Sequence, residues 1–420
     1  MADSERPAEL IARLAQSARA TLPLLAEISA AHRSAALRSA AASVRADAAC
    51  ILDANALDCA VGERAGLTLA MLDRLCLDPT RLEGIAAAIE AVAALPSPLG
   101  ETISRGERPN GLVLERVRIP IGLVGIVYES RPNVTADAAA LCFASGNAVL
   151  LRGGSEAAGT NRAIHAAFVQ GLAAEGVPRA TVQFVPTQDR SAVGAMLGAA
   201  GLIDMIVPRG GKNLVARVQA DARVPVLAHL DGNNATYVHA AADPAKATAI
   251  ALDAKMRRTG ICGAMETLLV DAAYPDAPAL LAALLDAGCE LRGDARAQAI
   301  DPRVLAASDE DWDTEYLDAV LSVAVVDGVG AAMAHIAAHG SHHTDAIVTE
   351  DDAIAAQFLA RVDSAIVMHN ASSQFADGGE FGLGAEIGIA TGRLHARGPV
   401  ALEGLTTYKW IVRGTGQTRG

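Results

Sequence analysis

The chain has 420 residues, of which 51% are hydrophobic but only 3% aromatic, and its formal net charge at pH 7 is −13. This length predicts two or three domains, with cores filled mainly by small aliphatic side chains. The acidic balance argues against sequence-independent binding of nucleic acid, which requires clustered lysine and arginine. It leaves room for a local basic pocket that binds a phosphate-bearing ligand.

The amino-terminal sequence MADSERPAEL has no basic-then-apolar run, so we expect no secretory signal. The longest strongly apolar stretch, 119–128, is about half of the ~20 residues that a membrane helix requires. Six cysteines occur without a metal-ligand spacing: Cys50, Cys59, Cys76, Cys142, Cys262 and Cys289. We expect reduced thiols in a soluble, cytoplasmic protein.

Residues 7–95 are rich in alanine and carry apolar side chains at helical spacing, which predicts three to five helices that end near the Pro-Ser-Pro of 96–98. The stretch 111–130 follows. Its first half alternates apolar and polar residues, as an exposed strand does, whereas 122–128 is apolar throughout and suits a buried parallel strand.

From this strand onward, strands and helices alternate. The strands are expected at 122–128, 148–151, 182–185 and 204–207, and the helices at 134–145, 156–174, 189–200 and 212–221. Units of this length predict parallel crossovers in an α/β fold with an open doubly wound sheet, which binds ligands beyond the carboxyl ends of its strands.

A second α/β section is expected over 237–363. Its helices are predicted at 243–256, 276–288 and 328–339, and its strands at 266–271, 320–326 and 345–349. The tail from Asn370 is rich in glycine and ends in an apolar–aromatic strand, TTYKWIV.

Two junctions between a strand and a glycine turn could bind phosphate. Gly210, Gly211 and Lys212 stand where a helix begins, so unpaired backbone N–H groups could face an anion, although an ordinary glycine turn is the alternative. Arg152 ends a predicted strand and could pair with a 2′-phosphate, or it could be a solvated surface arginine. The GxGxxG dinucleotide fingerprint is absent, so a nicotinamide cofactor would bind in a non-standard way.

Cys262 lies in a loop flanked by Gly260 and Gly263 and preceded by Lys255, Arg257 and Arg258. Nearby positive charge and access lower the pKa of a thiol, so Cys262 is a candidate nucleophile, with core filling as the alternative. The other five cysteines lie in alanine- or leucine-rich helical settings, where core filling is favoured.

His339, His342 and His343 raise the possibility of a metal site. His342 and His343 are adjacent and would point apart, and no carboxylate cluster with ligand spacing follows. A loop that precedes a strand is therefore the favoured interpretation, and we predict no metal.

Several stretches resemble one family, the glutamate-5-semialdehyde dehydrogenases, or gamma-glutamyl phosphate reductases, of the aldehyde dehydrogenase superfamily. The resemblance covers about 117–412 in the segments VRIPIGLVGIVYESRPNVTADAAALCFASGNAVLLRGGSEA, IVPRGGKNLV, RRTGICGAMETLLV, TEYLDAVLSVAVV, HTDAIVTED and FADGGEFGLGAEIGIATGRLHARGPVALEGLTTYKW. The last segment is the most specific.

The resemblance implies roles for individual residues. Cys262 would be the nucleophile, and Asn133 together with the Cys262 backbone N–H would form the oxyanion hole. The cofactor would be held at the adenosine ribose by Arg152, at the pyrophosphate by Gly210, Gly211 and Lys212, and at the nicotinamide ribose by Glu315.

The resemblance also implies three structural parts. A dinucleotide-binding domain would comprise 1–107 and 121–235 with a return segment 365–397, and a catalytic domain would span 236–364. A strand flap of 108–120 and 398–415 would pair subunits into a homodimer or homotetramer. The upstream glutamate kinase is a further candidate partner.

Hydrolytic members of the superfamily carry a water-activating glutamate in a Glu-Leu-Gly-Gly context, whereas this chain has Leu230, Asp231, Gly232 and Asn233. The resemblance therefore implies NADPH-dependent reduction of L-glutamate 5-phosphate to L-glutamate 5-semialdehyde and phosphate, through a Cys262 thioester, in proline biosynthesis. The alternatives are a hydrolytic NAD(P)-dependent aldehyde dehydrogenase and a catalytically silent dinucleotide-binding or scaffolding protein. Asp231 could assist the reaction or only orient its loop.

Overall fold

The computed structural model describes residues 6–129 and 131–419, which divide into two compact units. Unit 1 comprises 1–228, 383–388 and 400–420, and unit 2 comprises 229–382 and 389–399. The first five residues of the stretch in which we expect no secretory signal, and Ser130 after the buried strand, lie outside this description.

The division differs from the expected domains. It falls between Ala228 and His229 instead of at 235–236. Of the expected return segment 365–397, only 383–388 belong to unit 1, whereas 365–382 and 389–397 belong to unit 2, together with 398–399 of the expected flap. The physical reason is pairing, because β13 (Ile366–His369) adds to the sheet of unit 2 as a parallel neighbour of β12 (Thr344–Val348).

The amino-terminal part of unit 1 contains six helices among the described residues, where the sequence predicted three to five. They are α1 (Pro7–Arg19), α2 (Leu22–Glu27), α3 (Ala30–Ala46), α4 (Ala48–Arg64), α5 (Leu69–Leu75) and α6 (Pro79–Ala94). Side-chain caps separate them, since Ser29, Thr68 and Asp78 each accept a hydrogen bond from a backbone N–H of the helix that follows. The short α2 and α5 account for the difference.

Cys59 and Cys76 are joined in a disulfide, with their Cα atoms 5.9 Å apart. The expectation of six reduced thiols is therefore wrong for this pair. Cys59 lies in α4 and Cys76 caps the end of α5, so the turn between these two helices brings the sulfurs together. Sequence spacing alone does not contain that geometry.

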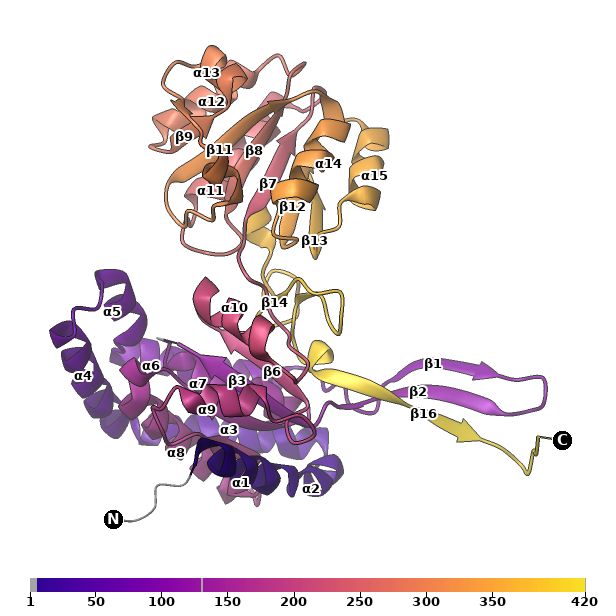
Figure 1. The fold of residues 1–420 in the computed structure, drawn as a ribbon. Helices are drawn as coiled ribbons and strands as arrows, with labels where there is room; N and C mark the ends of the chain where they lie inside the picture. The colour runs from indigo at the N-terminus through magenta and orange to yellow at the C-terminus, as the bar shows by residue number, and fades with distance from the viewer. Residues whose placement is uncertain (1–5, 130, 420) are drawn as a thin grey trace. The chain divides into compact units, whose positions relative to one another are not determined.

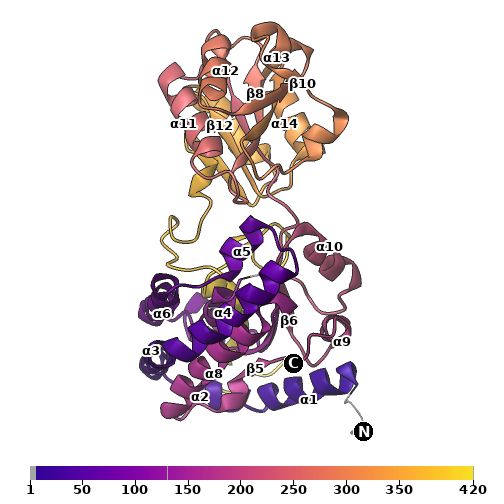
Figure 2. The same ribbon diagram turned by 90° about the vertical axis from the view of Figure 1, so that its left-hand side faces the viewer.

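The main sheet of unit 1 is parallel, as predicted, and the structure shows the strand order β5-β4-β3-β6. Its strands are β3 (Leu123–Tyr128), β4 (Ala148–Arg152), β5 (Val182–Phe184) and β6 (Met205–Arg209), and the helices that follow them are α7 (Asn133–Ala144), α8 (Ala158–Ala174), α9 (Ser191–Leu197) and α10 (Lys212–Asp221). Every residue of β3 is buried, so both faces of this central strand are covered. Figure 2 shows α3 and α8, which pack against each other, on the same side of this unit.

A small antiparallel sheet in unit 1 corresponds to the predicted strand flap. It consists of β1 (Thr102–Glu107), β2 (Val113–Pro120) and β16 (Thr406–Arg413), with β2 in the centre (Figure 1). Residues 102–107, expected in the cofactor domain, instead form the third strand. On β16, Tyr408, Trp410 and Val412 are 47%, 57% and 55% exposed, so this edge presents apolar side chains to solvent.

Unit 2 is built on a seven-stranded parallel sheet with the order β10-β9-β11-β8-β7-β12-β13. Its elements are β7 (Asn234–Val238), α11 (Pro244–Met256), β8 (Met265–Asp271), α12 (Ala277–Asp286), β9 (Glu290–Gly293), α13 (Ala295–Ile300), β10 (Leu305–Ala306), β11 (Val320–Val326), α14 (Gly328–His339), β12, α15 (Asp352–Arg361) and β13. The three predicted helices and three predicted strands are confirmed. The sequence missed β7, β9, β10, β13, α13 and α15, most of which are short.

Side chains of β8 point alternately to two hydrophobic cores. Leu268 and Val270 join the core under α11 and α12, whereas Leu269 joins the core under α14 and α15. Figure 1 shows these two helix pairs on opposite sides of the sheet. Among the described residues, no helix combines the length and the apolar character needed to span a bilayer.

Lys255 on α11 and Glu266 on β8 form an ion pair whose side chains are both completely buried. Removing two charges from water is costly, so each of them depends on the other. Burial also raises the pKa of Glu266, to about 7. The pair joins α11, which precedes the loop that carries Cys262, to β8, which follows it.

We predict that Lys255→Met lowers the free energy of unfolding by ~3–5 kcal/mol, because it leaves the Glu266 carboxylate buried without its partner. The matched control is Lys246→Met, which removes a pair with Glu350 that is about half exposed and should cost at most ~1 kcal/mol. Urea unfolding followed by circular dichroism measures both values. Equal losses of unfolding free energy in the two variants would show that the buried ion pair contributes no more to stability than the exposed one.

Candidate active site

Cys262 lies in the loop between α11 and β8, directly before a strand of the unit 2 sheet. The strands β8, β7 and β12 are parallel neighbours, so the segments that precede them meet at the same edge of the sheet. These segments carry Cys262 before β8, Gly232 before β7 and His343 before β12. The candidate site of unit 2 therefore lies at the amino ends of its strands.

The loop of Cys262 is held through its backbone. The buried side-chain amide of Asn234 donates hydrogen bonds to the carbonyl oxygens of Cys262 (2.7 Å) and Ala264 (2.8 Å). Gly232 packs directly on the same loop, because a Cβ atom at this position would lie only 2.2 Å from the Cys262 carbonyl oxygen. A side chain at position 232 would therefore displace the loop.

Glu315, in the segment before β11, contacts Gly232. Its carboxylate accepts a hydrogen bond from the Gly232 N–H, with the two atoms 3.0 Å apart. Gly232 thus contacts both Glu315 and the backbone of Cys262. The structure brings these two predicted site residues together at Gly232, which Asp231 precedes in sequence.

Two histidines, His229 and His343, lie near Cys262 and form a cluster with it. One donor atom each of His229, Cys262 and His343 lies within 4.8 Å of the other two, and the two imidazole rings meet edge to face with centroids 5.1 Å apart. Burial, followed by the charge of His229, lowers the pKa of His343 to about 3. His343 is therefore neutral throughout the physiological range.

The interpretation of His343 as the end of a loop before a strand is confirmed, since β12 begins at Thr344. His342 does point elsewhere and contacts the carbonyl oxygen of Asp363. The sequence missed the position of His343 beside Cys262, and it did not single out His229 or Asn234. His343 could have been placed directly before a strand from the sequence, but the sequence does not show that this strand lies next to β7 and near Cys262.

The positive charge expected around Cys262 is smaller than the sequence suggested. Lys255 is buried in its pair with Glu266 and does not supply an accessible cation. Arg257 and Arg258 are exposed, and Gln374 contacts the side chain of the first and the carbonyl oxygen of the second.

Asn133, the predicted oxyanion donor, is the first residue of α7 in unit 1. Its amide donates to Asp137 one helical turn later, at 2.7 Å, so Asp137 orients the amide. Burial raises the pKa of Asp137 to about 6, although the Asn133 hydrogen bond and nearby Arg209 act in the opposite direction. The sequence missed Asp137, for which the i, i+4 spacing was the available signal.

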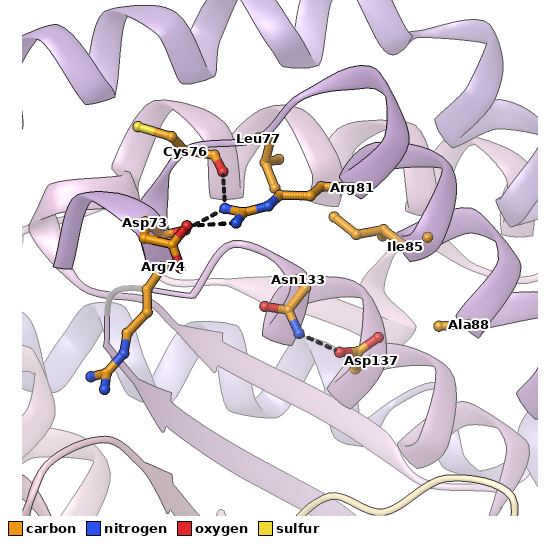
Figure 3. A pocket seen from close by; sticks show the side chains of 10 residues that line it. Asp73, Arg74, Cys76, Leu77, Arg81, Ile85, Ala88, Asn133 and Asp137 are labelled. Atoms are coloured by element: carbon orange, nitrogen blue, oxygen red, sulfur yellow. Dashed lines mark hydrogen bonds and ion pairs between the residues drawn. The ribbon is translucent and has the colours of Figure 1, made fainter. Parts of the chain in front are cut away.

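Asn133 and Asp137 line a cavity of about 340 Å³ within unit 1, together with residues from α5, α6 and the turn between them. Figure 3 shows the Asn133 amide directed toward Asp137, whereas Arg81 points away to Asp73 and the Cys76 carbonyl. The cavity gives the Asn133 side chain an accessible space.

Arg152 ends β4 and is only 7% exposed. Its guanidinium donates to the carbonyl oxygens of Gly153 and Gln188, but its Nε atom is buried without a hydrogen-bond partner among the described residues. Burial lowers the pKa of Arg152, and Glu156 opposes this effect. The solvated surface arginine considered as the alternative is excluded.

Gly210, Gly211 and Lys212 join β6 to α10 at the same edge of the unit 1 sheet as Arg152. Val127 pairs with Arg152 on one side and with Pro208 on the other, so the backbones of Arg152 and Pro208 lie about 10 Å apart. The N–H of Gly211, at the N-cap of α10, donates to the Glu129 carboxylate at 3.1 Å.

These features fit a phosphate-bearing dinucleotide. The start of α10 already binds an anionic group, the Glu129 carboxylate, and the buried Arg152 retains an unsatisfied donor. Lys212 is exposed at the first turn of the same helix. Asn133 and four of the five cofactor candidates lie in unit 1, whereas Cys262 and the fifth candidate, Glu315, lie in unit 2.

We compared the sequence and the structure with those of known proteins. The model of the aldehyde dehydrogenase family matches residues 4–298. The chain is 71% identical to a gamma-glutamyl phosphate reductase of Novosphingobium aromaticivorans, over 98% of this chain and 97% of that protein. It is 67% identical to one of Rhizorhabdus wittichii, over 98% and 96%. The crystal structure of gamma-glutamyl phosphate reductase from Thermotoga maritima is similar, with a TM-score of 0.96, 38% identity, and coverage of 98% of this chain and 100% of that one.

Proposed function

The chain belongs to the aldehyde dehydrogenase family and, within it, to the gamma-glutamyl phosphate reductases, and we propose that it reduces L-glutamate 5-phosphate to L-glutamate 5-semialdehyde and phosphate. This reaction supplies a precursor of proline. The observation that carries the proposal is Cys262, held through its carbonyl by Asn234 beside Gly232 and Glu315.

In the proposed mechanism the Cys262 thiolate attacks the acyl carbon of the substrate. The C–O bond to the phosphate breaks, phosphate leaves with the electron pair, and a Cys262 thioester remains. The Asn133 amide and the Cys262 backbone N–H hold the charge that develops on the carbonyl oxygen. A reduced nicotinamide cofactor, when bound, supplies the hydride. Collapse of the resulting hemithioacetal then releases the semialdehyde and regenerates the thiolate.

Asp137 supports the role of Asn133, because its hydrogen bond orients the amide before the substrate binds. Arg152 would contact the adenosine ribose and its 2′-phosphate, Gly210, Gly211 and Lys212 the pyrophosphate, and Glu315 the nicotinamide ribose. The unsatisfied Nε of Arg152 favours an additional acceptor such as the 2′-phosphate, so NADPH is the proposed cofactor.

The strand flap supports a proposal about assembly. Tyr408, Trp410 and Val412 expose apolar surface on β16, and pairing between subunits would bury it in a homodimer or homotetramer. The cytoplasm remains the proposed location, and the upstream glutamate kinase the proposed partner.

We predict that Cys262→Ala reduces turnover to below a few per cent of the wild-type value, because the acyl-enzyme requires sulfur, whereas binding of NADPH is retained. Cys50→Ala is the matched control, since Cys50 is an exposed thiol in unit 1. The measurement is NADPH consumption with L-glutamate 5-phosphate, together with fluorescence titration of NADPH. Substantial turnover in Cys262→Ala would refute the covalent mechanism.

In the oxidative direction we predict a steep dependence on added phosphate. Loss of the general base that activates water is worth ~100–10,000-fold, and Asp231-Gly232 stands where hydrolytic enzymes have that glutamate context. Phosphate is already ionised at neutral pH and needs no base. The measurement is NADPH formation from the semialdehyde and NADP over a phosphate series in phosphate-free buffer. A high, flat rate with glutamate as the product would favour the hydrolytic alternative.

For the cofactor, we predict a preference for NADPH over NADH that Arg152→Ala reduces by about 10- to 100-fold, the value of one or two charge-assisted hydrogen bonds. The quantity compared is kcat/KM for the two cofactors in wild type and variant. Arg217→Ala is a control, since this exposed arginine lies later on α10 and pairs with Asp221. An unchanged ratio in Arg152→Ala would show that another group sets the preference.

A further inference from the structure

His229, Cys262 and His343 present two imidazoles and one thiol at the amino edge of the unit 2 sheet. One donor atom of each residue lies within 4.8 Å of the other two. His343 is completely buried, and the other two side chains are half-buried. The proposed reaction uses only the thiol of this cluster.

A hydrogen bond holds each ring at its Nδ1 atom. The Nδ1 atom of His229 lies 2.8 Å from the carbonyl oxygen of Ile389, which can only accept, so in the neutral ring Nδ1 carries the proton and Nε2 the lone pair. The Nδ1 atom of His343 lies 2.9 Å from the Thr344 hydroxyl. Its Nε2 atom is buried and has no hydrogen-bond partner among the described residues.

We propose that His229, Cys262 and His343 bind a thiophilic divalent cation, Zn²⁺, and that the bound cation withdraws the Cys262 thiolate from catalysis. Two imidazole nitrogens and one thiolate are ligands that zinc prefers. The set contains no carboxylate, which argues against Mg²⁺ or Ca²⁺. Neighbouring ligand atoms around tetrahedral zinc lie about 3.5 Å apart, so the side chains need to move inward by only about 1 Å.

Binding has a defined chemical balance. Two Zn–N bonds and one Zn–S bond form, water ligands leave the cation, and the thiol proton passes to solvent. The metal is therefore an inhibitor that competes with the acyl substrate for one sulfur. Binding itself does not depend on the proposed function, but inhibition does, because it requires Cys262 to be the nucleophile.

The binding experiment uses the full-length chain with Cys50→Ser, which removes an exposed thiol. After treatment with a chelator and its removal, Zn²⁺ binding is measured by equilibrium dialysis, and Co²⁺ is used to observe a thiolate charge-transfer absorption band. We expect one tightly bound Zn²⁺ per chain, and loss of the Co²⁺ band in Cys262→Ala.

His343→Gln and His342→Gln form a matched pair of adjacent substitutions. His342 is exposed and bonds to the Asp363 carbonyl, outside the cluster. We expect His343→Gln to weaken Zn²⁺ binding at least about 10-fold and His342→Gln to leave it unchanged. If circular dichroism shows that His343→Gln does not fold, His229→Gln takes its place. Equal affinities in the wild type and the cluster variant would overturn the metal site.

Inhibition is measured on the same preparations. Zn²⁺ should abolish turnover and protect Cys262 from alkylation by iodoacetamide, and a chelator should reverse both effects. A Co²⁺ band that depends on Cys262, combined with full activity of Cys262→Ala, would refute the proposed role of Cys262 as the nucleophile while leaving the metal site intact. Activity that depends on Cys262, without a metal-dependent band or protection, would refute the metal site alone.

Discussion

The contact between Gly232 and the backbone of Cys262 is the constraint on which the site of unit 2 depends. A methyl group at position 232 would overlap the Cys262 carbonyl group, so the segment before β7 and the loop before β8 can approach only at a glycine. That approach lets the Gly232 N–H reach Glu315 and places Asn234 under the loop, where its amide holds two carbonyl oxygens. The loop that carries Cys262, the proposed nucleophile, is thus positioned through main-chain contacts.

The buried pair of Lys255 and Glu266 supports this arrangement from the other side. It joins the last turn of α11 to the start of β8, the two elements between which the loop of Cys262 is suspended. The sequence suggested that the positive charge of Lys255 activates the Cys262 thiol, but this charge instead stabilises the packing of α11 on β8. Two histidines, His229 and His343, instead place one ring nitrogen each within 4.8 Å of the Cys262 sulfur.

The candidate sites of the two sheets lie at opposite ends of their strands. In unit 1 the candidate phosphate-binding groups, Arg152 and the Gly210–Gly211 turn, follow the strands β4 and β6, as expected for a doubly wound sheet. In unit 2 the reactive groups precede the strands β7, β8 and β12. The general rule for parallel sheets thus agrees with the proposed cofactor-binding end of the unit 1 strands, whereas Cys262 lies at the opposite end of the unit 2 strands.

The sequence by itself determined the four strands of the main sheet of unit 1 and three of the seven strands of the unit 2 sheet, and it indicated Cys262 as the candidate nucleophile. Continuous apolar runs such as Leu123–Tyr128 can be buried only between two helical layers, and the family resemblance identified Cys262, Asn133 and Glu315. Only the tertiary structure decided what lies beside them. The disulfide of Cys59 and Cys76, the burial of Lys255 and the place of His343 next to Cys262 all depend on which segments pack together. Strand order and helix packing arise from contacts between residues far apart in the chain, which local periodicity does not specify.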